Sequence, residues 1–209
     1  IFHFFYYCME YLPEKKEIIL DRELSNLDKF VFKFIKIIEK HVDYVIISGY
    51  ISIVLGRARA TEDVDIFIKK MPYEKFNGMY QELKKKGFWC INGEREKEIF
   101  SYLNDGLAVR FARNGSSVPN FEVKFPKRSA DEEAFEDFIL LKMPNGKIKI
   151  SSLERQIAFK RYYLSAEKDI EDALHIEEAF KGKIDHKKVN KLKEHIERIK
   201  EDESRKQER

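Results

Sequence analysis

The chain contains few residues of the kinds that staple small secreted domains or form long linkers. Only two of its 209 residues are cysteines, and neither Cys8 nor Cys90 belongs to a Cys-x-x-Cys pair; the five histidines also lack metal-ligand spacing. The sequence therefore predicts neither a disulfide framework nor a zinc site, and a reducing, cytoplasmic location is the natural expectation. Nine glycines and five prolines leave little room for flexible linkers.

Neither sign of charge dominates the chain. Lysine and arginine total 40 and aspartate and glutamate 37, so the net charge of +3 is too small to indicate a nucleic-acid partner by itself. Basic residues are concentrated locally, where they could guide a polyanion or simply face solvent. These places are Lys84 to Lys86, Arg110 and Arg113, Lys124 with Lys127 and Arg128, and the C-terminal segment.

A long hydrophobic run is also absent. Residues Ile1 to Tyr7 are largely aromatic, but they are too short to span a bilayer and carry neither a basic region nor a small-residue cleavage site. The sequence therefore predicts no signal peptide and no membrane partner. Met9 opens a segment that resembles an ordinary protein start, so we interpret residues 1–8 as an extended or non-native N-terminus.

The most informative stretch is 48–68, which reads SGYISIVLGRARATEDVDIFI. Asp63 and Asp65 alternate with apolar residues, so on a strand both carboxylates would leave the same face. Neighbouring carboxylates repel each other and are tolerated mainly where a divalent cation neutralises them. Mg²⁺ binds carboxylate oxygens together with substrate phosphates, so this spacing predicts a metal site.

The residues before these aspartates have properties suited to a bound phosphate. Ser48 and Gly49 lie where the apolar strand YVII turns into an apolar-patterned helix. Glycine allows close approach of the backbone to a ligand, the serine hydroxyl can donate a hydrogen bond, and the start of a helix offers free N–H groups. Arg57 and Arg59 follow before the aspartates; they could stabilise phosphate charge, or pair with Glu62 or a helix C-terminus.

Together, the Ser48-Gly49 turn and the Asp63-Val64-Asp65 strand resemble the signature of the nucleotidyltransferase superfamily, which shares the palm of DNA polymerase beta-like enzymes. The run GRARATEDVDIFI is similar to the branch that includes the toxin of AbiE abortive-infection systems. The resemblance implies transfer of a nucleoside monophosphate from a nucleoside triphosphate (NTP) to an acceptor hydroxyl, with two Mg²⁺ or Mn²⁺ ions. Acceptors in the superfamily include RNA 3′ ends such as those of tRNA, proteins and small molecules. The AbiE-like similarity would add a toxin role and an antitoxin partner.

The superfamily needs a third carboxylate on a later strand, and Glu122 is the candidate. In NFEVKF the apolar Phe121 and Val123 share one face, which leaves Glu122 on the other. Glu122 would then complete the catalytic metal site with Asp63 and Asp65. The alternative is a solvated glutamate on a half-buried strand.

A second patch of similarity to the AbiE-like branch lies between Ile157 and Ile176. Lys160 supplies a point charge suited to phosphate, and Asp169 and Asp172 are neighbours at helical i, i+3 spacing. The resemblance implies that these three residues close the far side of a nucleotide cleft. The alternative is a solvated set of surface charges.

Apolar periodicity predicts an α/β (α+β) fold, with a mixed β-sheet palm core over residues 9–150 flanked by helices. A helix is predicted over 26–40 with Ser25 as its N-cap, and Asn145-Gly146 predicts a hairpin turn near the end of the core. Ser151 is predicted to cap a C-terminal helical region, residues 151–204, whose end beyond Lys200 has no apolar residue and should fray.

Two further functions stay open at this point. One is a catalytically inactive nucleotidyltransferase-like module that binds a nucleotide or a protein. The other is a nucleic-acid-binding protein that uses Lys124, Lys127 and Arg128 with the helical tail.

Overall fold

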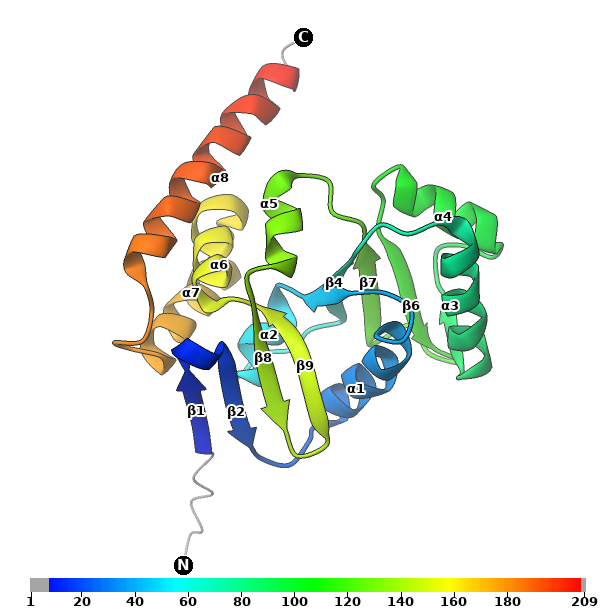
Figure 1. Ribbon diagram of the computed structural model, residues 1–209, viewed down its shortest axis with the longest axis horizontal. Coiled ribbons are helices and arrows are strands. Elements are labelled where there is room, and N and C mark those ends of the chain that lie inside the picture. Colours follow the sequence, from blue (N-terminus) through cyan, green and yellow to red (C-terminus); the bar gives the residue numbers. More distant parts are fainter. Residues whose placement is uncertain (1–7, 208–209) are drawn as a thin grey trace, which may run out of the picture.

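Residues 8–207 are described by a computed structural model, in which one mixed sheet runs through the molecule (Figure 1). The strands have the order β1-β2-β8-β9-β3-β4-β7-β6-β5. Their bounds are Cys8–Leu12 (β1), Glu17–Asp21 (β2), Tyr44–Ile46 (β3), Asp63–Ile68 (β4), Phe88–Cys90 (β5), Val109–Arg113 (β6), Asn120–Lys124 (β7), Phe138–Met143 (β8) and Gly146–Ser151 (β9). The predicted fold class, a mixed sheet with flanking helices, is confirmed.

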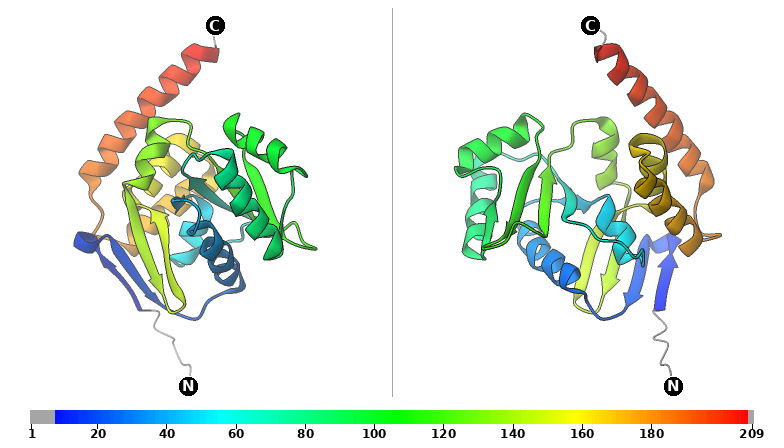
Figure 2. Two further views of the ribbon diagram at one scale, coloured as in Figure 1. Left: turned by 45° about the vertical axis from the view of Figure 1, so that its right-hand side comes forward. Right: turned by 180° about the vertical axis from the view of Figure 1, so that it is seen from behind.

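Several of the helices lie toward the two ends of this sheet, while α1 and α2 lie near its middle (Figure 1). Figure 1 and the rear view in Figure 2 show α3 and α4 at one end, α6 to α8 at the other, and α5 between them. The α-helices are Asn26–Ile38 (α1), Gly49–Val54 (α2), Tyr73–Lys85 (α3), Glu96–Asn104 (α4), Ser129–Glu132 (α5), Leu153–Ala158 (α6), Glu167–Ala179 (α7) and His186–Gln207 (α8). A π-helix, Phe159–Leu164, continues α6 directly. Within residues 8–207, no helix has an apolar stretch long enough to cross a membrane.

Helix α1 begins where the sequence predicts, because Ser25 caps it. The Asp28 N–H donates to Ser25 Oγ at 3.1 Å and the Ser25 N–H donates to Asp28 Oδ2 at 2.8 Å, which satisfies two of the free donors at the helix start. The apolar side of α1 packs on the sheet, where the rings of Phe34 and Phe121 stack with centroids 3.9 Å apart. This contact fixes one face of β7 against α1.

The central strands therefore have a covered face and an open face. On β4 and β7 the residues Val64, Ile66, Phe121 and Val123 are completely buried on the side of α1. Because side chains alternate along a strand, the residues between them project from the opposite face. The sheet thus presents its polar strand positions on the side away from α1.

Three local features differ from the sequence prediction. Ser151 is the last residue of β9, and Ser152 caps α6 by accepting a hydrogen bond from the Arg155 N–H at 3.3 Å. The predicted fraying beyond Lys200 is wrong, because α8 continues to Gln207 and Tyr163 Oη donates to Glu203 Oε2 at 3.2 Å. Strands β1 and β2 were not predicted; of residues 1–8, predicted as an extended N-terminus, only Cys8 is described.

Candidate active site

Three carboxylates lie on the open face of the sheet. Strands β4 and β7 are parallel neighbours, and their register pairs Asp65 with Glu122 and Asp63 with Asn120. Because in-register residues of neighbouring strands project to the same side, Asp63, Asp65 and Glu122 share the face opposite α1. The two segments that carry these acids are far apart in the sequence and become adjacent only through the β4–β7 pairing.

A lysine ammonium lies between two of these acids. Lys124 Nζ is 2.8 Å from Asp65 Oδ1 and 2.6 Å from Glu122 Oε1. The other oxygen of Glu122 accepts hydrogen bonds from Arg110 Nε at 3.1 Å and Nη2 at 2.9 Å. Glu122 is therefore held by two cations and is only 14% exposed, which excludes the alternative of a freely solvated glutamate.

Burial and the neighbouring charges shift the pKa values of two of these acids in opposite directions. Burial raises the pKa of the Asp65 carboxyl; the Lys124 ammonium opposes this shift, and the Glu122 and Asp63 carboxylates add to it. Burial also acts to raise the pKa of Glu122, but Lys124 and Arg110 outweigh it and the pKa is lowered. The neighbourhood thus favours a cation close to Asp65 and Glu122.

The donor set is chemically suited to a hard divalent cation. Three carboxylates offer the oxygen ligands that Mg²⁺ and Mn²⁺ prefer, and the Lys124 ammonium already occupies a cation position between two of them. No three acidic, histidine or cysteine side chains among residues 8–207 surround one point in a metal-ligating arrangement, and the Lys124 ammonium lies between Asp65 and Glu122. A metal ion would therefore use Asp63, Asp65 and Glu122 only after the Lys124 side chain has moved.

The Ser48-Gly49 turn is close to the same acids and has an unusual backbone. Ser48 has φ 64° and ψ −137°, a conformation that non-glycine residues adopt at a cost and that is found mainly at functional sites. A Cβ at Gly49 would collide with the guanidinium of Arg59 and contact Thr61 Oγ1. Thr61 Oγ1 in turn donates to the carbonyl of Asp63 at 3.0 Å, so the residue beside the turn is hydrogen-bonded to the first aspartate.

Beside the acids lies a cleft of about 600 Å³, a size typical of ligand sites. Its lining includes Ser48, Asp65 and Lys124 together with residues from the segment around α5 and from residues 151–164. Basic side chains outnumber acidic ones in the lining. The basic residues are Lys124, Lys127, Arg128, Arg155, Lys160 and Lys168, and the acidic ones are Asp65, Asp131 and Asp169. This lining suits a polyanion, and Phe159 and Tyr163 add aromatic rings that could contact a planar base.

Lys160 lines this cleft and belongs to a buried ion network. Its Nζ is 2.8 Å from Asp172 Oδ2 and 3.5 Å from Asp169 Oδ1. Lys160 is 1% exposed and Asp172 is completely buried, so the alternative of solvated surface charges is wrong. The π-helix that contains Lys160 is itself a rare element that recurs at functional sites.

Arg57 and Arg59, which lie in the segment before β4, belong to the same ion network. Arg57 Nε is 3.1 Å and Arg59 Nη2 is 3.0 Å from the carboxylate of Asp172, and Arg57 also pairs with Glu171. Neither pairs with Glu62, which was one of the expected partners. Burial acts to raise the pKa of Asp172, but Lys160, Arg59 and Arg57 outweigh it and the pKa is lowered. The network therefore joins α7 to the segment that leads into β4.

Comparison with solved structures gives a name to the fold. An antigenic nucleotidyltransferase-like protein from Paracoccidioides brasiliensis aligns with a TM-score of 0.50 and 18% identity, covering 87% of this chain and 92% of that chain. The antibiotic-resistance factor ANT(2'')-Ia aligns with a TM-score of 0.54 and 13% identity, covering 87% of this chain and 97% of that chain. The fold is nucleotidyltransferase-like.

A second structure of ANT(2'')-Ia, in complex with adenylyl-2''-tobramycin, aligns with a TM-score of 0.53 and 14% identity and covers 84% of this chain and 99% of that chain. At such low identities the likeness concerns the fold and does not transfer an activity. No protein-family model matches the sequence, and no curated protein matches it.

The predicted site residues fall into two groups in space. Ser48, Asp65, Lys160 and Asp169 line the cleft. The others adjoin it: Asp63 and Glu122 on the sheet face, Gly49 in the turn, and Arg57, Arg59 and Asp172 in the ion network.

Sequence reasoning missed the position of Lys124 and Arg110 beside the acids. Alternation on β7 was the available signal for Lys124, because a residue two positions after Glu122 must share its face. The signal for Arg110 was non-local, since its contact with Glu122 depends on the β6–β7 register.

Proposed function

We propose that the protein is a metal-dependent nucleotidyltransferase that transfers a nucleoside monophosphate from an NTP to an acceptor hydroxyl. The observation that carries the proposal is the cation position between Asp65 and Glu122, beside a cleft with a basic lining. Divalent ions held by Asp63, Asp65 and Glu122 would supply charge neutralisation and activation of the acceptor hydroxyl.

The residues of the chain have separate tasks in this proposal. The Ser48-Gly49 turn lies where the phosphates of an NTP in the cleft would meet backbone N–H groups. Lys124 also lines the cleft, so its ammonium is available for a phosphate once a divalent ion replaces it between the carboxylates. Lys160 also lines the cleft, and its ion pairs with Asp172 and Asp169 fix its position there.

The test is incubation of the protein with each labelled NTP, Mg²⁺ or Mn²⁺, and total RNA, followed by separation of RNA, protein and small molecules. We expect metal-dependent label in one acceptor fraction and its loss in Asp65→Ala. Asp21→Ala, which removes an exposed aspartate at the end of β2, is the matched control and should label as the wild type does. Label that survives Asp65→Ala would reject the assigned site.

A nucleotide-binding module without turnover is the second candidate, favoured by the pairing of Lys124 and Arg110 with the acids. It predicts NTP binding by equilibrium dialysis with no label transferred under any metal condition. Transfer by the wild type and not by Asp65→Ala would exclude this candidate.

We also propose a toxin role with an antitoxin partner, on the single ground of the AbiE-like run from Gly56 to Ile68. Growth arrest on expression should then require Asp65 and be relieved by a protein encoded beside this gene. Arrest by Asp65→Ala as strong as by the wild type would contradict a catalytic toxin.

A further inference from the structure

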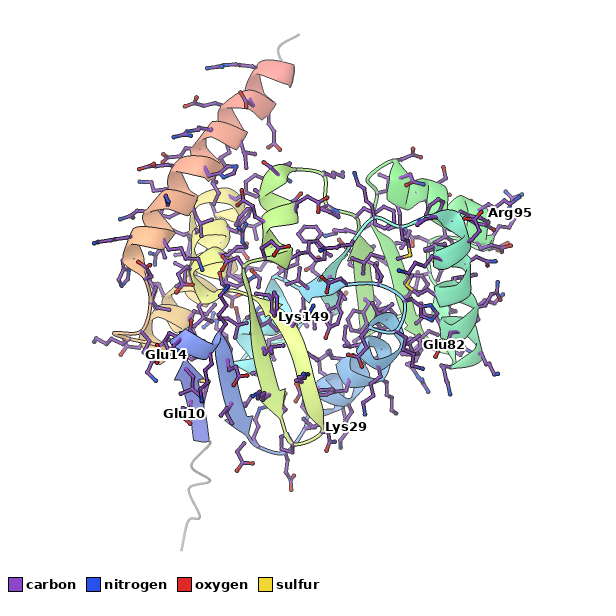
Figure 3. All side chains as sticks on the ribbon, viewed as in Figure 1. Glu10, Glu14, Lys29, Glu82, Arg95 and Lys149 are labelled. Atoms are coloured by element: carbon purple, nitrogen blue, oxygen red, sulfur yellow. The ribbon has the colours of Figure 1, made fainter. Side chains whose placement is uncertain are left out.

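The solvent side of α1 carries one kind of charge. After its first residue, the exposed positions of this helix are Lys29, Lys33 and Lys36, while the rest are buried or half-buried. The spacing i, i+4, i+7 places the three lysines on one stripe, roughly 6 and 4.5 Å apart along the axis. Figure 3 labels Lys29 on α1 and Glu82 on α3, the two helices whose C-terminal ends border the hollow described next.

A hollow of about 610 Å³ continues this stripe on the surface. Its charged lining consists of Lys33, Lys36, Lys40, Lys86 and Arg113 with the single acid Glu39, and Ile37 and Phe88 complete it. The formal charge of this lining is +4, which exceeds the +3 of the whole chain. The hollow is therefore one of two places with an excess of basic residues, the other being the cleft lining.

Most of these cations have no acidic partner. Within residues 8–207, Lys33, Lys36 and Lys86 take part in no ion pair, and Arg113 Nη1 donates to the carbonyl of Lys86 at 3.0 Å. Lys40 is the exception, because its Nζ is 2.6 Å from Glu82 Oε1. Clustered like charges repel each other unless an anion neutralises them, so the basic hollow is suited to a polyanion.

An exposed aromatic ring lies at the adjacent edge of the sheet. Strand β5 is the edge strand; Phe88 contributes to the basic hollow, and the next residue, Trp89, projects from the opposite face. Trp89 is 39% exposed, and its Nε1 donates to the carbonyls of Arg113 and Ser116 at 3.1 and 3.0 Å. The indole is therefore held in place with its hydrogen-bond donor satisfied, which leaves part of the ring available for stacking.

We propose that the basic hollow and Trp89 bind a single-stranded nucleic acid that passes around the β5 edge. The lysines and Arg113 would contact its phosphates, while an unpaired base would stack on Trp89. Proteins that bind single strands without sequence preference combine a positively charged groove, which contacts the phosphates, with aromatic side chains on which the bases stack. Trp89 projects from the same face of the sheet as Asp65 and Glu122, so the bound strand would lead toward the acids. The binding itself does not require the cleft to be catalytic.

Fluorescence anisotropy with labelled single-stranded RNA and DNA oligonucleotides, measured over a series of salt concentrations, tests this proposal. For the double variant Lys33→Gln/Lys36→Gln we expect the slope of log K against log salt to fall by about 1.4, because each phosphate contact on a single strand contributes about 0.7. At about 0.1 M salt this corresponds to roughly 25-fold weaker binding. The matched control is Lys187→Gln/Lys191→Gln, two exposed lysines of α8 outside any ion pair of the described residues, and it should bind as the wild type does.

Substitution of Trp89 separates stacking from charge. Trp89→Ala should weaken binding by roughly 5- to 150-fold, the range of base–aromatic stacking, with no change in the salt slope. Asp65→Ala removes an acid and should not weaken oligonucleotide binding, whereas it should abolish nucleotide transfer, so a failure of the catalytic proposal and a failure of this one are distinguishable.

Three results would overturn the proposal. One is an unchanged salt slope in Lys33→Gln/Lys36→Gln, and another is a loss of oligonucleotide binding in Lys127→Gln/Lys168→Gln, two exposed lysines of the cleft lining, which would assign the binding to the cleft. The third is displacement of the oligonucleotide by polyglutamate at an equal charge concentration, which would identify an acidic protein as the partner. RNA and DNA are compared in separate arms, and tighter binding of either supports the proposal.

Discussion

Replacing Asp172 by asparagine tests the buried ion network that joins α7 to the approach to β4. Asp172 is completely buried, and its carboxylate has Lys160 Nζ at 2.8 Å, Arg59 Nη2 at 3.0 Å and Arg57 Nε at 3.1 Å. The amide of Asp172→Asn keeps the shape and removes the charge. Lys160, which is 1% exposed, would then keep only Asp169 at 3.5 Å as an acidic partner.

The expected loss of unfolding free energy is about 3 to 5 kcal/mol, the usual effect of leaving a buried charge without its partner. For a chain of this size each kcal/mol lowers Tm by roughly 2 to 4 °C, so Tm should fall by roughly 6 to 20 °C. Lys160→Met is the informative comparison. It leaves the Asp172 carboxylate with both guanidinium groups, so we expect a smaller loss of about 1.5 kcal/mol or less.

Urea unfolding followed by circular dichroism at pH 7 measures both variants. Glu197→Gln is the control, because it breaks an exposed i, i+4 pair with Lys193 and should change the free energy by less than about 0.5 kcal/mol. A loss below about 1 kcal/mol for Asp172→Asn would refute the reasoning. So would a loss for Lys160→Met as large as that for Asp172→Asn, since the order of the two variants follows from which charge stays compensated.

Three other perturbations have defined outcomes. Tyr50→Phe removes the buried hydrogen bond of 2.8 Å from Tyr50 Oη to Asp28 and should lower the unfolding free energy by about 1.5 to 3 kcal/mol; an unchanged urea midpoint would contradict this. The folded-state pKa values of Asp28 and Asp172 are lowered, so their stabilisation is present above the unfolded pKa of about 3.9 and is lost as the pH falls through the folded values. The unfolding free energy of the wild type should therefore be lower at pH 3 than at pH 7, and the difference should be smaller in Asp172→Asn. An equal pH dependence in the wild type and in Asp172→Asn would contradict this assignment. Lys124→Met removes two partly exposed salt bridges of about 0.5 to 1 kcal/mol each, so Mn²⁺ measured by electron paramagnetic resonance should bind roughly 5- to 30-fold more tightly without nucleotide. Weaker Mn²⁺ binding would show that Lys124 does not compete with the metal.

The parts of the fold that depend on local pattern could be predicted from the sequence. Helix α1 starts at its predicted residue because Ser25 and Asp28 form a capping box within a few residues of chain. The alternation in β7 likewise placed Glu122 on the opposite face from Phe121. In both cases the signal and its structural consequence lie within one short window.

The parts that depend on distant contacts could not be predicted in this way. β2 forms hydrogen bonds with β8, more than a hundred residues away in the sequence, and the local composition of β1 and β2 gives no sign of this pairing. The burial of Lys160 and its contacts with Asp169 and Asp172 arise from the packing of the π-helix against α7. Charged residues for which the sequence allows a solvent-exposed position can therefore be buried beside the cleft.

The environment of Tyr50 also could not be predicted from the local sequence. From its sequence position next to Gly49 it could either line a ligand pocket or pack in the core. The structure places it in the core, completely buried and hydrogen-bonded to Asp28. Whether a residue beside a motif faces the ligand depends on which helix lies behind it, and here that helix is α1.

The last turns of α8 act on a region that is remote in sequence. Glu203 lies 3.5 Å from Arg128 Nη1 and 3.2 Å from Tyr163 Oη, and the Arg128 guanidinium is 4.7 Å from the centre of the Tyr163 ring. Arg128 and Tyr163 both line the cleft, so one carboxylate near the end of α8 contacts two residues of the cleft lining. A fusion partner or a shortened chain at this end would therefore alter the cleft, although no residue beyond Asp169 lines it.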